Sequence, residues 1–243
     1  MGAALLVVVG LVAAIVWTVM VRGWRCLTWQ MVTELPGGGF YIGREGGFLN
    51  AIVGSVYIVA ASTALSLAVS IPVVFYLNVY LRGSSRLAYA ARLAFDVLFG
   101  IPSIVYGAFA FALMIWLGLR TSLLGGILVT TLLTIPIMIR TMDEVAANIP
   151  RELHEAVCSL GATRFETACV LLRQITPGIA TATLLSVGRA IGDAAGVMFT
   201  AGFSDSLPTS LTRPAATLPL SIFFQLNARR LRCRTAPTSP PWC

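Results

Sequence analysis

The sequence predicts an all-α protein that crosses a membrane several times, and three observations support this fold class. Hydrophobic residues make up 57% of the 243 residues and charged residues only 11%, less than half of the roughly 25% found in soluble domains. The 17 basic residues are all arginine and lie between apolar runs, not in the single basic patch that nucleic-acid binding needs. Several of these apolar runs are long enough to span a bilayer.

Five runs reach or approach the roughly 20 residues that a helix needs to cross the hydrocarbon core. The first has no basic segment before it and is longer than the apolar part of a signal peptide, so we expect a membrane helix there. Residues 22–48 are then a periplasmic loop, and residues 49–226 form the main transmembrane domain. The predicted membrane helices cover residues 1–21, 46–81, 97–119, 121–139 and 174–204.

The arginines also predict the orientation of the chain. Short cytoplasmic loops carry more basic residues than loops on the other side of a membrane. More arginines lie in the loops that follow the second and fourth runs than on the opposite face, which places the N-terminus in the cytoplasm. The arginines assigned to the cytoplasmic side are Arg82, Arg86, Arg92, Arg140, Arg151, Arg164 and Arg173.

The loop between the fourth and fifth runs, residues 143–176, is the most informative polar segment. Apolar residues recur there at helical spacing, and Gly161 is placed to end that helix with a positive φ. Thr163 and Glu166 have the spacing of a capping box, which predicts a second helix that closes at Pro177. Two short amphipathic helices joined by a glycine suit docking into a groove of a partner protein.

Residues 155–161, EAVCSLG, resemble the EAA loop of ABC-transporter permease subunits. In that family the loop inserts its first helix into a cleft of the ATP-binding subunit. The resemblance implies that Glu155, Ala156 and Gly161 belong to the surface that couples this chain to an ATP-binding partner. The chain lacks the proline that the family often has near the end of the motif, so the second helix is expected to run on to Pro177. An ordinary amphipathic connection is the alternative.

Arg189 and Asp193 are charged residues inside the otherwise apolar fifth run, and charges within membrane helices by default indicate a functional site. Four positions apart on one helix, they would share a face and pair. One interpretation is that Arg189 binds an anionic substrate with its planar guanidinium while Asp193 holds that group in place. The alternative is that the two charges neutralise each other and hold helices together.

Four segments are similar to the permease subunit of the bacterial high-affinity phosphate ABC transporter, the PstA type. The resemblance covers roughly residues 1–226 and implies the MetI-like permease fold. It also implies that Arg189, Asp193 and Arg140 line the substrate pathway, with Asp193 in place of the family's glutamate. The four segments are residues 45–59, 95–107, 133–144 and 188–202.

The same resemblance implies the location and the partners of the chain. It would be a multi-pass protein of the bacterial inner membrane, surrounded by lipid and paired with a sister permease subunit in a heterodimer. A dimer of ATP-binding subunits would hydrolyse ATP, since this chain has no P-loop motif, and a periplasmic phosphate-binding protein would deliver the substrate. No pattern of cysteines or histidines predicts a metal or cofactor. The alternatives are a permease for another oxyanion, such as sulfate or molybdate, and an intramembrane enzyme.

The C-terminal segment departs from this family. The family has a sixth membrane helix, whereas residues 227–243 contain arginines, prolines and cysteines that cannot form one. Back-translation in a shifted frame gives a family-like sequence, so we expect that the sixth helix is lost through a frameshift; a genuine divergent tail is the alternative. The start is expected to be set too late, because the family has basic residues before its first helix.

Overall fold

The computed structural model describes residues 2–24, 28–36, 47–81 and 86–224, and these residues form helices and connecting segments without a β-strand. The expected all-α class is therefore confirmed. The chain divides into two compact units, residues 1–49 and residues 50–243, and each is described by itself. The predicted tail and residues 25–27 and 37–46 of the predicted periplasmic loop lie outside the described residues.

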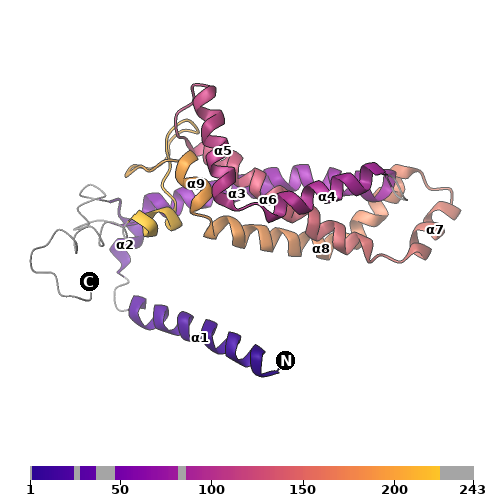
Figure 1. The fold of residues 1–243 in the computed structure, drawn as a ribbon, viewed down its shortest axis with the longest axis horizontal. Coiled ribbons are helices and arrows are strands. Elements are labelled where there is room, and N and C mark those ends of the chain that lie inside the picture. The colour runs from indigo at the N-terminus through magenta and orange to yellow at the C-terminus, as the bar shows by residue number, and fades with distance from the viewer. Residues whose placement is uncertain (1, 25–27, 37–46, 82–85, 225–243) are drawn as a thin grey trace, which may run out of the picture. The chain divides into compact units, whose positions relative to one another are not determined.

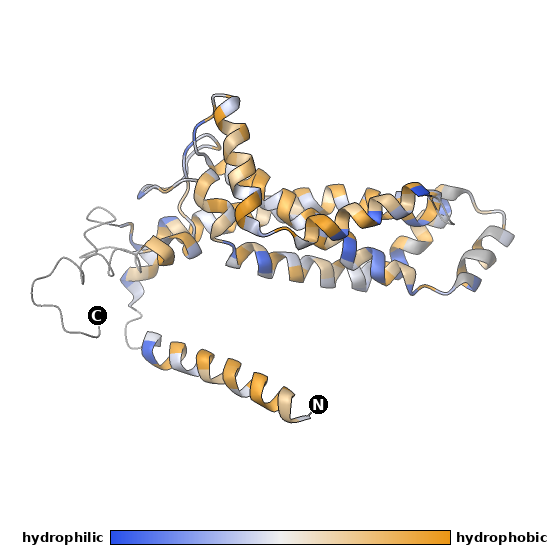
Figure 2. Ribbon diagram, viewed as in Figure 1, coloured by the Kyte–Doolittle hydropathy of each residue, from blue (hydrophilic) through white to orange (hydrophobic). Residues whose placement is uncertain are grey.

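The first unit contains the long helix α1 (Gly2–Trp24) and the short helix α2 (Trp29–Thr33). Helix α1 is apolar along most of its length, as Figure 2 shows, and it is long enough to cross a membrane. After α2 the chain returns to this helix, where the N–H of Phe48 donates to the carbonyl of Met31 at 2.7 Å.

The boundary between the units falls at the start of α3 (Leu49–Phe75), which passes without interruption into the π-helix η1 (Tyr76–Tyr80). Pro72 lies inside α3, and the helix continues through it. Together the two elements make one apolar stretch long enough to span a membrane, as the second run predicts.

The predicted third membrane helix, residues 97–119, is not a single straight helix. The structure has α4 (Arg86–Gly100) and α5 (Ser103–Trp116), which are bent by 98° at the intervening break. Pro102 explains the break, because proline disfavours the helical conformation of the residue before it. The predicted third membrane helix therefore begins in the last residues of α4 and continues, beyond the break, through α5.

Helix α6 (Leu123–Ala147) is the most buried long helix of the described chain and contacts α4, α5, α8 and α9. Hydroxyl side chains line its interface with α3, where Ser66 and Thr134 share a hydrogen bond of 2.6 Å. Within α6, Thr130 and Thr131 donate to carbonyls one turn earlier. Their polar atoms are thus satisfied without water, as a membrane interior requires.

Helix α7 (Arg151–Ser159) and helix α8 (Arg164–Gly192) follow at the end of this bundle (Figure 1). Gly161 has a φ of 78°, and both hydrogen bonds of the predicted capping box are present, so these two predictions are confirmed. The prediction that Pro177 ends the second helix is wrong. Helix α8 contains Pro177 and continues to Gly192.

The fifth predicted membrane helix, residues 174–204, is also divided. Helix α8 ends at Gly192, and the short helix α9 (Ala195–Thr200) follows. Three of the described helices are long and apolar enough to cross a membrane, or four if α4 and α5 form one broken span, compared with five expected. Helix α8 is not among them, since its charged first half and Arg189 lower its hydropathy.

Gly54 of α3 offers a test of how closely this helix approaches the segment after α9. A Cβ atom at Gly54 would collide with the carbonyl oxygen of Ala216, and backbone cannot move aside as a side chain can. We expect Gly54→Ala to cost about 1–3 kcal/mol through overpacking, which lowers the melting temperature in detergent by roughly 2–4 °C per kcal/mol. Gly10→Ala, where nothing lies within 4 Å, is the control. Equal melting of both variants would contradict the close approach.

Candidate functional site

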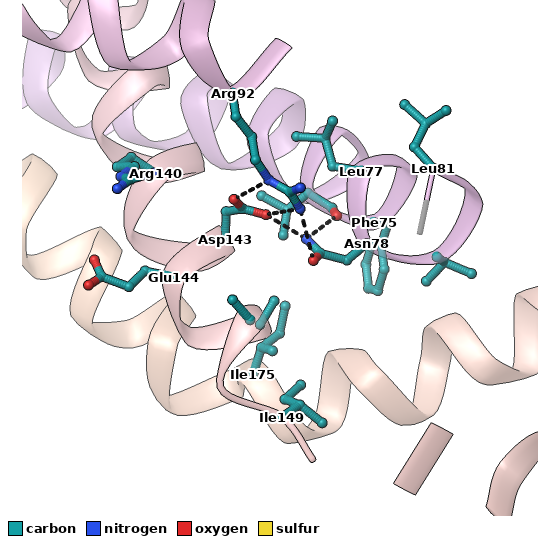
Figure 3. Close-up of a pocket in the computed structure, with 14 residues that line it drawn as sticks. Phe75, Leu77, Asn78, Leu81, Arg92, Arg140, Asp143, Glu144, Ile149 and Ile175 are labelled. Atoms are coloured by element: carbon teal, nitrogen blue, oxygen red, sulfur yellow. Dashed lines mark hydrogen bonds and ion pairs between the residues drawn. The ribbon is translucent and has the colours of Figure 1, made fainter. Parts of the chain in front are cut away.

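A pocket of about 500 Å³ lies between η1, α4, α6 and the first half of α8 (Figure 3). Apolar residues of α3, η1 and α6 form much of its wall, and Ile175 contributes from α8. Five polar or charged side chains also line it: Asn78, Arg92, Arg140, Asp143 and Glu144.

Three of these side chains form one hydrogen-bonded cluster, which we call the Asp143 cluster: Asn78, Arg92 and Asp143. Arg92 donates from Nε to Oδ2 of Asp143 at 2.8 Å and from Nη2 to Oδ1 at 3.1 Å. Asn78 donates from Nδ2 to the same Oδ1 at 2.8 Å. The side chain of Asp143 is only 8% exposed, so its charge depends on these three donors.

Asn78 has a second role, because it lies in the π-helix η1. Its Nδ2 donates to the carbonyl of Val74 at 3.0 Å, one turn earlier, while the N–H of Leu81 donates to Tyr76 five residues before it. Short π-helical turns occur frequently at functional sites. The amide of Asn78 donates to a backbone carbonyl just before η1 and to Asp143 at the same time.

Arg140, a predicted pathway residue, also lines this pocket. Its Nε lies 3.3 Å from Oδ1 of Asp96 on α4, and both side chains are nearly half exposed. The two ion pairs between α4 and α6 thus have opposite polarity, with an arginine of each helix facing an aspartate of the other. A pathway role for Arg140 stays a prediction.

Arg189 and Asp193 do not meet as expected. Arg189 is exposed near the end of α8, and its guanidinium forms no ion pair with another described residue. Asp193 lies beyond that helix with extended backbone angles, is buried, and accepts the N–H of Gly196 at Oδ2 over 3.2 Å. The expected pairing along one helix face is therefore wrong, because the helix ends before Asp193. The carboxylate caps the start of α9 instead.

The predicted coupling residues lie in the two-helix unit formed by α7 and the start of α8. Glu155 and Ala156 belong to α7, and Gly161 forms the turn that follows. Ala156 and Gly161 are exposed, as a docking surface requires. Their contact with a partner stays a prediction.

Sequence reasoning missed the Asp143 cluster. The sequence assigns Arg92 to the cytoplasmic side and places Asp143 at the start of the loop and within the family-like segment 133–144, but it gives neither residue a partner. One signal was present: Arg92 and Asp96 are four residues apart, and Arg140 and Asp143 are three apart, so each helix presents opposite charges on one face. Which helix would meet which was not visible in the sequence.

Comparison with known proteins places this architecture among membrane transport components. Residues 68–223 match the family described as binding-protein-dependent transport system inner membrane component. The chain is 32% identical over 210 residues to the phosphate transport system permease protein PstA of Haemophilus influenzae, covering 86% of this chain and 73% of that protein.

Two further relatives are similar over comparable lengths. Phosphate transport system permease protein PstA 1 of Mycobacterium tuberculosis is 31% identical over 219 residues, which is 88% of this chain and 71% of that protein. The probable ABC transporter permease protein YqgI of Bacillus subtilis is 28% identical over 220 residues, which is 84% of this chain and 74% of that protein.

The role of Asp193 can be tested by two substitutions. Asparagine keeps an oxygen that accepts the N–H of Gly196, whereas alanine removes it. We expect Asp193→Asn to melt close to the wild type and Asp193→Ala to cost about 1 kcal/mol as a lost cap, or roughly 2–4 °C in melting temperature. If Asp193→Asn were as unstable as Asp193→Ala, the charge rather than the cap would be essential.

The capping box predicts that the start of α8 is sensitive to acid. The backbone N–H and the hydroxyl of Thr163 both donate to Oε2 of Glu166, and these bonds lower the pKa of Glu166. A carboxyl whose pKa is lower in the folded state stabilises that state fully above the unfolded pKa, and the stabilisation is lost as the pH falls through the folded pKa.

We therefore expect the amides of the first turn of α8 to keep their protection from hydrogen exchange at neutral pH and to lose it as the pH falls below about 4.3, the ordinary pKa of glutamate. Glu166→Gln, which cannot titrate, is the control and is expected to show no such step. Unchanged protection of the wild type at acid pH would contradict a stabilising role of the Glu166 carboxylate in the capping box.

Proposed function

The chain belongs to the family of binding-protein-dependent transport system inner membrane components, and we propose that it is a permease subunit that carries inorganic phosphate across the bacterial inner membrane. The family is one of transport components rather than enzymes, and its members work with ATP-binding and substrate-binding partners. In this proposal ATP hydrolysis takes place on a separate subunit. The similarity to PstA proteins over most of the chain is the observation that carries the choice of phosphate.

The position of Arg189 supports an anionic substrate. Its guanidinium is exposed and, among the described residues, has no carboxylate partner, so both of its parallel donors are free for an oxyanion. The helix also ends three residues later, and broken helices are where many transporters form their substrate sites. Asp193 acts in this proposal through the cap on α9, by fixing the chain just beyond Arg189.

The two-helix unit of α7 and the start of α8 supplies the link to ATP hydrolysis. Helix α7 with Glu155 and Ala156 docks into a groove of the ATP-binding subunit, and Gly161 sets the turn that makes the unit compact. A cytoplasmic N-terminus and a sister permease subunit complete the proposed arrangement. The periplasmic phosphate-binding protein delivers its ligand from the opposite face of the membrane.

Substitution of Arg189 tests the substrate pathway. Hydrogen bonds to charged groups are worth about 1.5–3 kcal/mol, so we expect Arg189→Gln to lower phosphate uptake at least about tenfold. We expect Arg189→Lys to lower phosphate uptake as well, because lysine keeps the charge but lacks the planar pair of donors of the guanidinium. The measurement is uptake of labelled phosphate into proteoliposomes that contain the complete transporter.

Arg173→Gln is the matched control, since Arg173 is an exposed arginine of the same helix. Normal phosphate uptake by Arg189→Gln would contradict the proposed pathway. Efficient uptake of sulfate in place of phosphate by the wild type would instead show that the substrate is another oxyanion.

A further inference from the structure

The Asp143 cluster joins three elements beside the unit that is proposed to bind the ATP-binding subunit. We infer, on the basis of the proposed function, that this cluster is a mechanical joint. By this we mean that it transmits movement of α7 through the end of α6 to η1 and α4, which form the opposite wall of the pocket. Arg92, Asn78 and Asp143 are positioning residues in this inference and do not bind the substrate.

The position of Asp143 in the chain is the first argument. It lies in the last turn and a half of α6, four residues before that helix ends at Ala147, and α7 begins at Arg151. The short connection holds Ile149, which packs against the same apolar cluster as Leu77 of η1. A displacement of α7 therefore acts on the end of α6 through this connection, and on α8 through the turn at Gly161.

The strength of the cluster is the second argument. Asp143 is buried and accepts three hydrogen bonds, two from Arg92 and one from Asn78. Separating the pair would leave the buried carboxylate of Asp143 without its cation, which is unfavourable although Arg92 itself is 37% exposed. Movement of the end of α6 away from α4 and η1 is therefore opposed, and we expect the three elements to move together.

The two elements that the cluster joins to α6 each contain or end at a departure from straight α-helix, and this is the third argument. Helix η1 has π-helical hydrogen bonding, and Asn78 itself satisfies a carbonyl of Val74 there. Helix α4 ends at the 98° bend before α5. Packed elements of this kind shift between discrete arrangements rather than deforming continuously. The joint thus connects the two-helix unit of α7 and the start of α8 to η1 and to the helix that ends at this bend.

The charges of the pocket favour a joint over a second site for phosphate. Both arginines that line it already face carboxylates, Arg92 with Asp143 and Arg140 with Asp96. Glu144 adds another acidic residue to the lining. An oxyanion entering here would have to displace a carboxylate, whereas Arg189 needs no such exchange.

Asp143→Asn is the decisive substitution, because it removes the charge but nearly preserves the shape. In the complete transporter we expect the phosphate moved per ATP to fall about fivefold or more, in line with typical coupling free energies, while ATP hydrolysis and copurification of the ATP-binding subunit persist. Asp96→Asn is the matched control: it removes a half-exposed carboxylate from the other ion pair between the same helices. We expect the phosphate moved per ATP by Asp96→Asn to stay within about twofold of the wild type, because exposed ion pairs contribute little.

A second readout does not depend on the identity of the substrate. Val79 lines the pocket, so Val79→Cys, with the native cysteines replaced by serine, can be labelled by a water-soluble maleimide. We expect ATP to change the labelling rate with Asp143 present and to leave it unchanged in Asp143→Asn. Asp143→Glu, which keeps the carboxylate, is expected to restore part of the change.

The outcomes separate this inference from the proposed function. A wild-type transporter that hydrolyses ATP without carrying phosphate would overturn the substrate assignment alone, and the labelling experiment would still decide on the joint. An ATP-dependent change in labelling that survives in Asp143→Asn would overturn the joint. If Asp143→Asn does not assemble, Arg92→Lys takes its place; failure of both to assemble would show a purely structural cluster and would also overturn the inference.

Discussion

A membrane interior offers no water, so a polar group within it is costly unless it finds a partner inside the protein, and such partners join the helices of the second unit. Four buried hydroxyls of the described residues lack one: Thr63, Ser70, Ser186 and Thr217. Hydroxyl groups of α6 find partners locally, by donating to carbonyls of their own helix. The buried carboxylates Asp143 and Asp193 find them by accepting N–H donors from neighbouring elements. The first fixes α4 and η1 against α6, and the second fixes the start of α9.

The features predicted correctly from the sequence are those whose partners are close in the chain. The capping box of Thr163 and Glu166 and the turn at Gly161 each depend on a few consecutive residues, so their chemistry could be recognised directly. The all-α class followed from composition in the same way. The bend at Pro102 also has a local signal, because proline kinks or breaks a helix at its own position.

The features that the sequence did not predict depend on contacts between distant residues or on competing local partners. Arg92 and Asp143 are 51 positions apart, and nothing in either segment identifies the other as its partner. Asp193 could have paired with Arg189 one turn before it or capped the residues after it, and helical spacing favoured the first. The cap prevails because the chain leaves the helical conformation at Asp193.

Helix α8 connects the two regions of functional interest within one continuous element. Its 29 residues give a length of about 43 Å at 1.5 Å per residue. Thr163 caps one end beside the docking unit, and Arg189 lies in the last turn at the other. Pro177, near the middle, removes one backbone donor, and the helix continues through it. The residue proposed to meet the substrate is therefore joined to the proposed docking surface by a single helix, in addition to the route through the Asp143 cluster.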